Sequence, residues 1–269
     1  MPWLILIAAL LLLLLALFIL YNNRFIVRSY TVETEKPIGE KRIVLLSDLH
    51  NKVYGEGNRP LLDCIDALKP DLIVIAGDLV DKRRPKISVG VAFAEGCAEI
   101  APTYYVCGNH ERERDNFDEI CAKLKATKVL RNEYTEVCGL HLMGITDHHE
   151  LPFEEPSAVL EEFEKLEGYK IVAVHRPADF FSEMEIRTHN VDLQLSGHTH
   201  AGVAHIPFGG AVFAPGEGIL PKYSQGMFEE QGTTLIVGGG LGNTKLPIRL
   251  FNFPEIVEIS IKTKKTLAK

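Results

Sequence analysis

The fold of this chain is decided by the stretch QLSGHTHAG (194–202), in which two histidines follow a glycine at the end of an apolar run. Val191, Leu193 and Leu195 alternate with polar residues, as they would in a strand. A single His-x-His pair is weak support for a site, because neutral histidines often lie in protein cores with a satisfied hydrogen bond. The pair becomes informative if other strands of the chain end in residues of the same chemistry.

Apolar runs recur along the 269 residues and alternate with helical patterns. Apolar residues return every three to four positions in 59–68 and in 156–166, as on the buried face of a helix. The pattern predicts an α/β fold in which helices cover a largely parallel sheet. Strands are expected at 42–47, 71–77, 103–108, 140–145, 169–175 and 191–197, and added β structure, forming a second sheet, at 203–238 and 255–263.

Residues of metal-ligand types follow five of these strands. An aspartate after a strand is usually a cap or turn residue, and a Gly-Asn pair is usually a turn. Local structure explains five such strand ends poorly, because the ligands of an open α/β sheet collect at the carboxyl ends of its strands. The residues are Asp48 and His50, Asp78, Asn109 and His110, His175, and His198 and His200.

The chemistry of this set is that of a two-metal centre. Carboxylate oxygens with imidazole nitrogens suit Mn, Fe, Zn or Co, whereas Ca prefers oxygen alone and structural zinc sites are rich in cysteine. Two such ions about 3.5 to 4 Å apart can share a carboxylate and a bridging hydroxide, which attacks a phosphoryl group at neutral pH. The chain has no GxxxxGK[ST] and no GxSxG motif, so nucleotide-driven work and serine hydrolysis lack support.

Five ordered motifs resemble those of the calcineurin-like metallophosphoesterases. They are SDLH (47–50), GDLVD (77–81), GNHE (108–111), VAVHRP (172–177) and SGHTH (196–200). Two further stretches, 201–223 and 240–259, are similar to the YkuE/YaeI branch, whose members are often membrane-associated. The resemblance implies a four-layer α/β/β/α sandwich over 42–269, preceded by a transmembrane anchor at 1–23 and by a linker with a first strand at 24–41.

The resemblance also implies a role for each candidate residue. His110 would be catalytic, stabilising the phosphoryl oxygens or protonating the leaving alkoxide. Asp81 and Glu111 would either orient ligand imidazoles or serve as plain surface or capping residues. Two divalent ions are expected, with Mn the first choice for assays and Fe, Zn or Co as alternatives. One ion would be held by Asp48, His50 and His200, the other by Asn109, His175 and His198, with Asp78 bridging them.

The segment at 3–21, WLILIAALLLLLLALFILY, has no charge, Gly or Pro and as a helix would extend about 28 Å, enough to cross a bilayer core. A cleaved signal peptide is the alternative, but it normally has a basic start and a small-x-small cleavage site, and here Met1 and Pro2 precede the run. We expect a retained single-pass anchor in the cell membrane. Arg24, Arg28 and Lys36 follow the span, which favours the cytoplasmic side for the body.

Composition argues against several other classes of protein. The formal net charge is −7, and no Lys/Arg cluster interleaves with aromatic residues, so no nucleic-acid partner is expected. The five cysteines are odd in number and form no CxxC pair, which indicates reduced thiols rather than a disulfide framework or a zinc ribbon. The pattern leaves the oligomeric state open.

The predicted function is that of a membrane-anchored, binuclear-metal phosphoesterase acting on a phosphomonoester, phosphodiester or pyrophosphate. A phospholipid or a UDP-linked acylated sugar is the expected substrate, because the anchor holds the site near lipid headgroups and 208–228 offers an apolar flank. The alternative is a membrane-tethered metal-binding scaffold with the same fold and no turnover. The residues of the flank are Phe208, Val212, Phe213, Ile219, Leu220 and Phe228.

Overall fold

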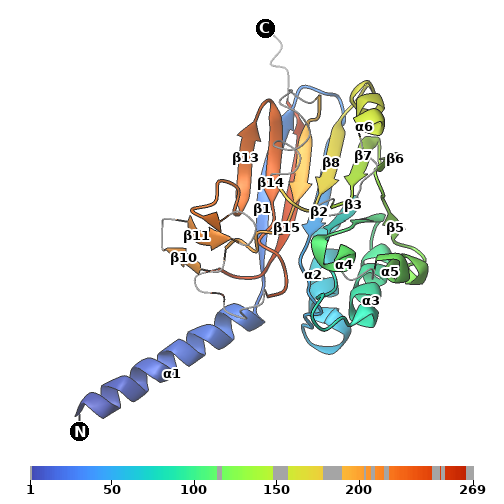
Figure 1. Cartoon of the computed structure of the whole chain (residues 1–269). Coiled ribbons are helices and arrows are strands. Elements are labelled where there is room, and N and C mark those ends of the chain that lie inside the picture. Colours follow the sequence, from blue (N-terminus) through green and yellow to red (C-terminus); the bar gives the residue numbers. More distant parts are fainter. Residues whose placement is uncertain are drawn as a thin grey trace.

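The protein forms a four-layer body from which one long helix projects (Figure 1). The structure is a computed structural model of the whole chain. It describes residues 2–113, 117–147, 157–177, 190–202, 204–206, 210–214, 218–243, 249 and 252–264.

The first sheet has six strands in the order β1-β15-β2-β3-β4-β5. β2 to β5 run parallel, and β15 lies between β1 and β2, parallel to β1 and antiparallel to β2. Helices α2 (Arg59–Leu68), α3 (Ile87–Ala98) and α5 (Phe117–Lys123) cover its outer face. The strands are β1 (Ile26–Thr34), β2 (Glu40–Leu46), β3 (Leu72–Ala76), β4 (Thr103–Val106), β5 (Lys128–Val129) and β15 (Glu255–Thr263).

The second sheet also has six strands, in the order β13-β14-β9-β8-β7-β6. Its four inner strands are parallel, and both edge strands are antiparallel to their neighbours. Helix α6 (Ser157–Glu164) covers its outer face. The strands are β6 (Glu133–Val137), β7 (Leu140–Ile145), β8 (Lys170–Val174), β9 (Leu193–Ser196), β13 (Gly226–Glu230) and β14 (Thr233–Val237).

The main core lies between the two sheets and takes alternate residues from their strands. Ile43 and Leu45 of β2 share this cluster with Leu193 and Leu195 of β9. The intervening residue Val44 points the other way, into the cluster under α2 and α3. The period of two explains the layering, because each inner strand buries both faces, one against a sheet and one against a helix or loop.

The predicted α/β/β/α sandwich is confirmed, but the six predicted strands do not all belong to one largely parallel sheet. All six predicted strands are present, but β2, β3 and β4 belong to the first sheet and β7, β8 and β9 to the second. A strand with apolar residues on both faces looks the same in sequence whether a helix or another sheet covers it. Residues 255–263, expected in a second sheet, form β15 in the interior of the first.

The region from 203 onward divides between two places instead of forming one added sheet. β10 (Ala204–Ile206), β11 (Gly210–Ala214) and β12 (Gly218–Ile219) make a small antiparallel sheet of their own. β13 and β14 extend the second large sheet beside β9. The five cysteines are free thiols, as expected.

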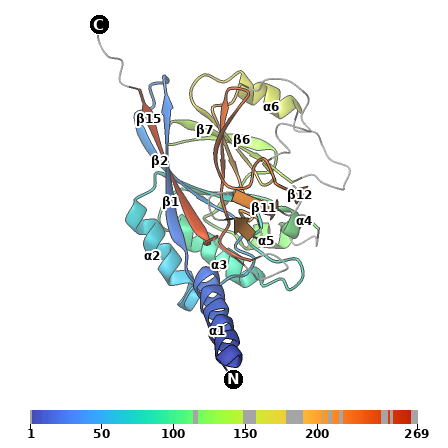
Figure 2. The same ribbon diagram turned by 90° about the vertical axis from the view of Figure 1, so that its left-hand side faces the viewer.

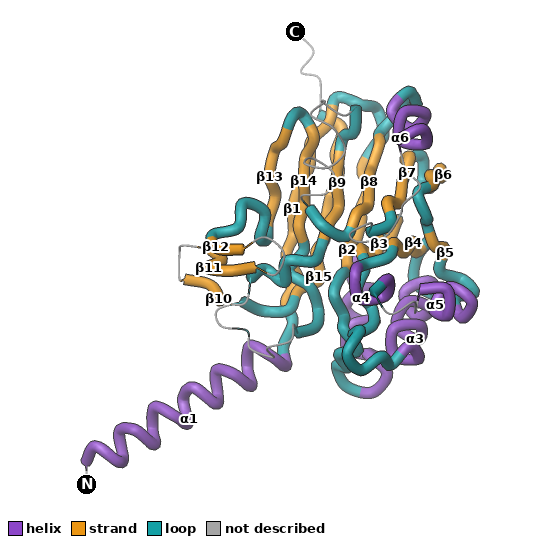
Figure 3. The backbone as a smooth tube through the Cα atoms, in the orientation of Figure 1, coloured by secondary structure: helices purple, strands orange, loops and turns teal. Residues whose placement is uncertain are grey.

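Helix α1 (Pro2–Asn23) projects from the body, and no residue of its most apolar stretch is buried. Only its last turn is tied down: Lys52 Nζ donates to Asn22 O at 2.8 Å, and the rings of Tyr21 and Phe253 lie 4.4 Å apart. β1 begins three residues after the helix ends and pairs along its length with β15 (Figure 3). The division into anchor, linker and domain at residues 23 and 41 stays a prediction.

Replacing Leu195 with Ala tests the core between the sheets. Leu195 is fully buried, so its truncation should lower the free energy of unfolding by about 2 to 5 kcal/mol, measured by urea denaturation in mild detergent. Leu220→Ala is the control, because Leu220 is 69% exposed and its loss should change the free energy by less than about 0.5 kcal/mol. Equal effects of the two changes would contradict the described core.

Candidate metal centre

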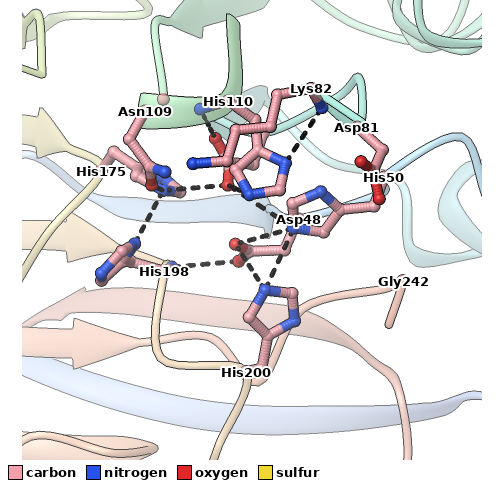
Figure 4. Close-up of polar contacts among 12 residues, drawn as sticks. Asp48, His50, Asp81, Lys82, Asn109, His110, His175, His198, His200 and Gly242 are labelled. Atoms are coloured by element: carbon pink, nitrogen blue, oxygen red, sulfur yellow. Dashed lines mark hydrogen bonds and ion pairs between the residues drawn. The ribbon is translucent and has the colours of Figure 1, made fainter. Parts of the chain in front are cut away.

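All eight candidate residues converge at the ends of β2, β3, β4, β8 and β9 (Figure 4). Three groups among them have potential ligand atoms within 4.8 Å of one another. The groups are Asp48, His50 and His200; His50, Asp78 and His110; and Asp48, Asp78 and His175. Strands from both large sheets therefore supply one cluster, which the sequence prediction anticipated from the strand ends alone.

The first half of the cluster consists of Asp48, His50 and His200. The Nε2 atoms of His50 and His200 lie 3.0 Å apart, and Asp48 Oδ1 lies 3.5 Å from the Nε2 of His200 and 3.8 Å from that of His50. Asp48 Oδ1 is buried and has no hydrogen-bond partner among the described residues. Burial raises the pKa of the Asp48 carboxyl to about 6. A cation among these three atoms would relieve that cost, so the donor set fits a divalent ion with mixed N and O ligands.

The second half consists of Asn109, His175 and His198. His175 Nε2 lies 3.2 Å from Asn109 Oδ1 and 3.2 Å from His198 Nδ1. His175 Nδ1 lies 2.7 Å from Ala76 O, so the proton of the neutral ring belongs on Nδ1, where it donates to that carbonyl. The arrangement leaves Nε2 with its lone pair facing the other two side chains, which suits a second divalent ion.

Asp78 lies between the two halves. Its Oδ1 accepts a hydrogen bond from the His110 backbone N–H at 2.9 Å. Its Oδ2 lies 3.5 Å from His50 Nε2 and 3.4 Å from His175 Nε2. One carboxylate oxygen is thus held by the backbone, and the other faces an imidazole nitrogen from each half.

The backbone at the centre adopts a conformation that residues other than glycine seldom take. Five candidate residues have φ between 46° and 71°, in the left-handed region: Asp48, His50, Asp78, His198 and His200. Asp and His tolerate this region better than most residues, but each instance still costs about 1 to 2 kcal/mol. Such outliers persist where the surrounding structure holds them, and they gather at functional sites.

Two glycines in the motifs are required by close approach. A Cβ on Gly108 would lie 2.2 Å from Asp78 Oδ1, and a Cβ on Gly197 would lie 2.7 Å from Asp48 Oδ2. Both distances are far below van der Waals contact. The glycines of GNHE and SGHTH therefore make room for the two carboxylates.

Glu111 joins the loops that carry the centre. Its buried carboxylate accepts backbone N–H groups from Asp78 at 3.0 Å, Val80 at 2.9 Å and Gly108 at 3.1 Å. Burial and the nearby Asp78 charge raise the pKa of Glu111 to about 8. Glu111 thus matches the capping alternative rather than the imidazole-orienting one, while Asp81 pairs with Arg83.

Charge within the cluster is divided unevenly among its groups. Burial lowers the pKa of His50 to about 3, and it holds the pKa values of His198 and His200 well below their usual range. Burial alone would raise the pKa of Asp78, but the His175 imidazolium outweighs it and lowers that pKa strongly. Burial opposes protonation of His175, yet Asp78 raises its pKa to about 10. A bound cation would take the place of that proton, since metal binding requires the neutral imidazole.

Arg176 is a site residue that the sequence analysis missed. Its Nη1 lies 3.3 Å from His198 Nε2, and its Nε donates to Asp147 Oδ2 at 2.7 Å. The Arg176 side chain is 15% exposed, so a guanidinium stands at the edge of the cluster. Arg176 directly follows the predicted ligand His175 in VAVHRP, so its place in the motif could have indicated a basic residue near the site.

The glycine-rich segment 238–242 lies against the ligand loop. Leu241 N donates to Ser47 O at 3.0 Å, and Gly242 N donates to Asp48 O at 2.5 Å. The buried Arg249 guanidinium in turn donates to the carbonyls of Gly239, Gly240 and Gly242. The segment thus supports the backbone that presents Asp48.

Known proteins share the sequence that builds this centre. A family model described as Calcineurin-like phosphoesterase matches residues 41–202. An uncharacterized metallophosphoesterase of Aquifex aeolicus is 31% identical, over 88% of this chain and 92% of that protein. YkuE of Bacillus subtilis, also described as an uncharacterized metallophosphoesterase, is 28% identical, over 82% of this chain and 79% of that protein.

Two further relatives are longer than the region that this chain matches, and one of them is described as a transmembrane protein. A Bos taurus protein described as a transmembrane protein with metallophosphoesterase domain is 27% identical, over 82% of this chain and 53% of its own length. A metallophosphoesterase of Helicobacter pylori, 27% identical over 88% of this chain, is matched over 64% of its length. The chain thus spans about half to two thirds of these two relatives.

The matched region contains the five loops that bring the candidate residues together, and it covers more than half of the chain. The expected likeness to YkuE is confirmed as well. The chain belongs to the calcineurin-like phosphoesterase family, and it is a metal-dependent phosphoester hydrolase.

Proposed function

We propose that this hydrolase works with two divalent ions bridged by Asp78 and that α1 anchors it in a membrane. One ion would be held by Asp48, His50 and His200, and the other by Asn109, His175 and His198. The observation that carries the proposal is the position of Asp78 Oδ2, 3.5 Å from His50 Nε2 and 3.4 Å from His175 Nε2. An oxygen with an imidazole nitrogen from each half at nearly equal distance is suited to two ions.

The chain's own residues orient the substrate around this pair. When bound, two such ions make water a nucleophile near neutral pH and neutralise phosphoryl oxygens. His110 Nδ1 accepts a hydrogen bond from the Lys82 backbone N–H at 3.3 Å, which leaves the ring proton on Nε2. His110 Nε2 lies 4.0 Å from Asp78 Oδ2, so this N–H faces the centre. We assign it to a phosphoryl oxygen or to the leaving oxygen.

Arg176 is the second group we assign to the substrate. Asp147 Oδ2 accepts a hydrogen bond from its Nε, and its Nη1 lies at the edge of the cluster, 3.3 Å from His198 Nε2. A planar guanidinium binds phosphate oxygens through paired N–H groups. His110 and Arg176 come from different sheets, so they would contact the phosphoryl group from two sides.

The anchoring part of the proposal rests on α1. The helix has 22 residues, mean hydropathy 3.3 in its most apolar window, and none of that window buried in the body. Trp3 and Tyr21 lie near its two ends, where aromatic residues are favoured at membrane interfaces. Arg24 follows the span and favours the cytoplasmic side for the body. The transmembrane relative of Bos taurus supports a membrane location for this chain.

The substrate class follows from the anchor. An enzyme that its anchor keeps close to the lipid headgroups meets the phosphate esters of membrane amphiphiles at a high local concentration. A phospholipid or a UDP-linked acylated sugar fits that position. Whether the scissile bond is a monoester, a diester or a pyrophosphate is tested by comparing p-nitrophenyl phosphate with bis(p-nitrophenyl) phosphate.

Replacing Asp78 with Asn should remove most bound metal and nearly all turnover. The amide still accepts the His110 N–H, but it lacks the charge between the two histidine pairs. The loss of metal affinity should exceed the 10- to 100-fold that is typical of residues around the ligands, about 100-fold or more. Metal content by mass spectrometry and Mn-dependent hydrolysis of bis(p-nitrophenyl) phosphate measure the two effects.

Asp81→Asn is the matched control for this change. Asp81 lies in the same GDLVD loop but pairs with Arg83, so its amide variant should retain both metal and turnover. Full activity of Asp78→Asn would refute the bridging assignment.

Replacing His110 with Asn should separate catalysis from metal binding. We expect metal content near that of the wild-type chain and turnover reduced by about 100-fold or more, as for loss of a general acid. The reduction should be smaller for an ester whose leaving group needs no proton, such as p-nitrophenol, than for an alkyl ester. Loss of metal in this variant would instead identify His110 as a ligand.

A further inference from the structure

The small sheet β10–β12 exposes apolar side chains to solvent. Ile219 is 78% exposed and Leu220 69%, and Phe213 and Val212 are 45% and 37% exposed. β11 and β12 pair in antiparallel register with Phe213 opposite Ile219, and Leu220 N donates to Val212 O at 2.9 Å, so the four residues form two neighbouring cross-strand pairs. We call Val212, Phe213, Ile219 and Leu220 the apolar tip. Several exposed apolar side chains gathered at one place on a protein indicate an interaction surface.

The apolar tip lies on the side of the body from which α1 leaves. In Figure 1 the small sheet projects to the left of the large sheets, and α1 runs to the lower left. Figure 2 turns that side toward the viewer, and both α1 and the sheet then lie in front of the large sheets. A membrane crossed by α1 would therefore lie against the same side as the tip.

The last turn of α1 fixes this relation. Lys52 Nζ donates to the carbonyl of Asn22, Tyr21 packs on Phe253, and β1 starts almost at once. These contacts place the end of α1 directly against the body. A surface next to the exit of the span stays next to the bilayer.

The local conformation also singles out the tip. Leu220 has φ of 52°, a left-handed conformation that Asn or Gly would adopt at lower cost. A leucine held there and 69% exposed contributes little to the core of the protein. Its side chain gains from burial only if something outside the chain covers it.

The small sheet is linked to the metal centre at both of its ends. A Cβ on Gly202, just after the GHTH motif, would lie 2.6 Å from Ala211 Cβ and 2.9 Å from Phe213 O. Thr199 Oγ1 donates to Ser224 O at 2.5 Å, which ties the segment after β12 to the same motif. The small sheet thus contacts the loop that carries His198 and His200.

We propose that the apolar tip inserts into the headgroup region of the bilayer that α1 crosses. The metal centre is then held at the level of lipid headgroups, and its substrate is a phosphate ester carried by a membrane amphiphile. The inference rests on the proposed anchoring by α1. Apolar faces of helices that lie in the membrane interface are buried about 5 to 10 Å into the boundary between headgroups and acyl chains, and we expect insertion of similar depth for the apolar tip.

Tryptophan fluorescence in liposomes tests the insertion. Trp3 is the single tryptophan of the chain, so Trp3→Phe gives a dark background for the full-length protein. Ile219→Trp in this background reports on the apolar tip. Tyr134→Trp is the control, because Tyr134 is 37% exposed in β6, at the opposite edge of the body (Figure 1). Liposomes of phosphatidylcholine brominated near the headgroup end of the acyl chain serve as the quencher.

We expect bromination to reduce the emission of Ile219→Trp by about twofold, because the side chain enters the interfacial layer, and to leave Tyr134→Trp unchanged. In the wild-type background, Trp3 reports separately on α1. Quenched Trp3 with unquenched Ile219→Trp would overturn the insertion and leave the anchor intact. Unquenched Trp3 and Ile219→Trp together would overturn both the anchor and the insertion.

A double variant tests whether membrane insertion depends on the apolar tip, with the metal centre left unchanged. Ile219→Ser with Leu220→Ser should abolish shallow insertion but leave hydrolysis of the soluble ester bis(p-nitrophenyl) phosphate unchanged. Circular dichroism verifies that the variant is folded. Retained quenching at a Val212→Trp reporter in this variant would contradict the proposal, because insertion would then not depend on the apolar tip.

Discussion

The metal centre depends on how the Asp78 carboxylate is held between two sets of imidazoles. Its Oδ1 is fixed by the His110 N–H, and its backbone N–H is fixed by Glu111. Gly108 leaves the space that the carboxylate occupies. A shift of one ångström would bring Oδ2 closer to one half of the cluster at the expense of the other. The loops after β3 and β4 are therefore built as one unit around a single oxygen atom.

The imidazoles around Asp78 come from both large sheets. His50 and Asp78 follow strands of the first sheet, whereas His175 and His200 follow strands of the second. The core between the sheets, with Leu45 and Leu195 in one cluster, fixes their separation. The packing of the sandwich thus sets how closely the ligands from the two sheets approach one another within each half of the centre, and a close-packed core changes that distance little.

The sequence predicted the strands and the residues at their ends because both depend on local pattern. Apolar runs of four to six residues and the polar residues after them are visible without any knowledge of contacts. The distribution of the strands over two sheets was not visible from periodicity, because β3 and β8 are equally apolar on both faces. The resemblance to a known family supplied the four-layer sandwich, but not the sheet to which each strand belongs.

Other features depended on contacts between distant segments. Ala76 O orients His175 through a backbone carbonyl, which has no sequence signature. Glu111 accepts hydrogen bonds from three backbone N–H groups of two loops. The GNHE motif did not indicate whether Glu111 orients an imidazole or caps the backbone. Arg176 was in a recognised motif, but its contact with His198 is a property of the fold. Phe208, part of the expected apolar flank, lies outside the described residues, whereas Phe213 and Ile219 of that flank are exposed on the small sheet.

The central claim is that Asp78 joins two metal ions, and electron paramagnetic resonance of Mn²⁺ tests it most directly. The metal-free full-length chain in detergent is titrated with Mn²⁺, and the low-temperature spectrum is recorded at each step. The account predicts saturation at two ions per chain and, at saturation, the spectrum of a spin-coupled pair, because two ions about 3.5 to 4 Å apart share a bridge. Saturation at one ion, or two ions with the spectra of isolated Mn²⁺, would contradict it.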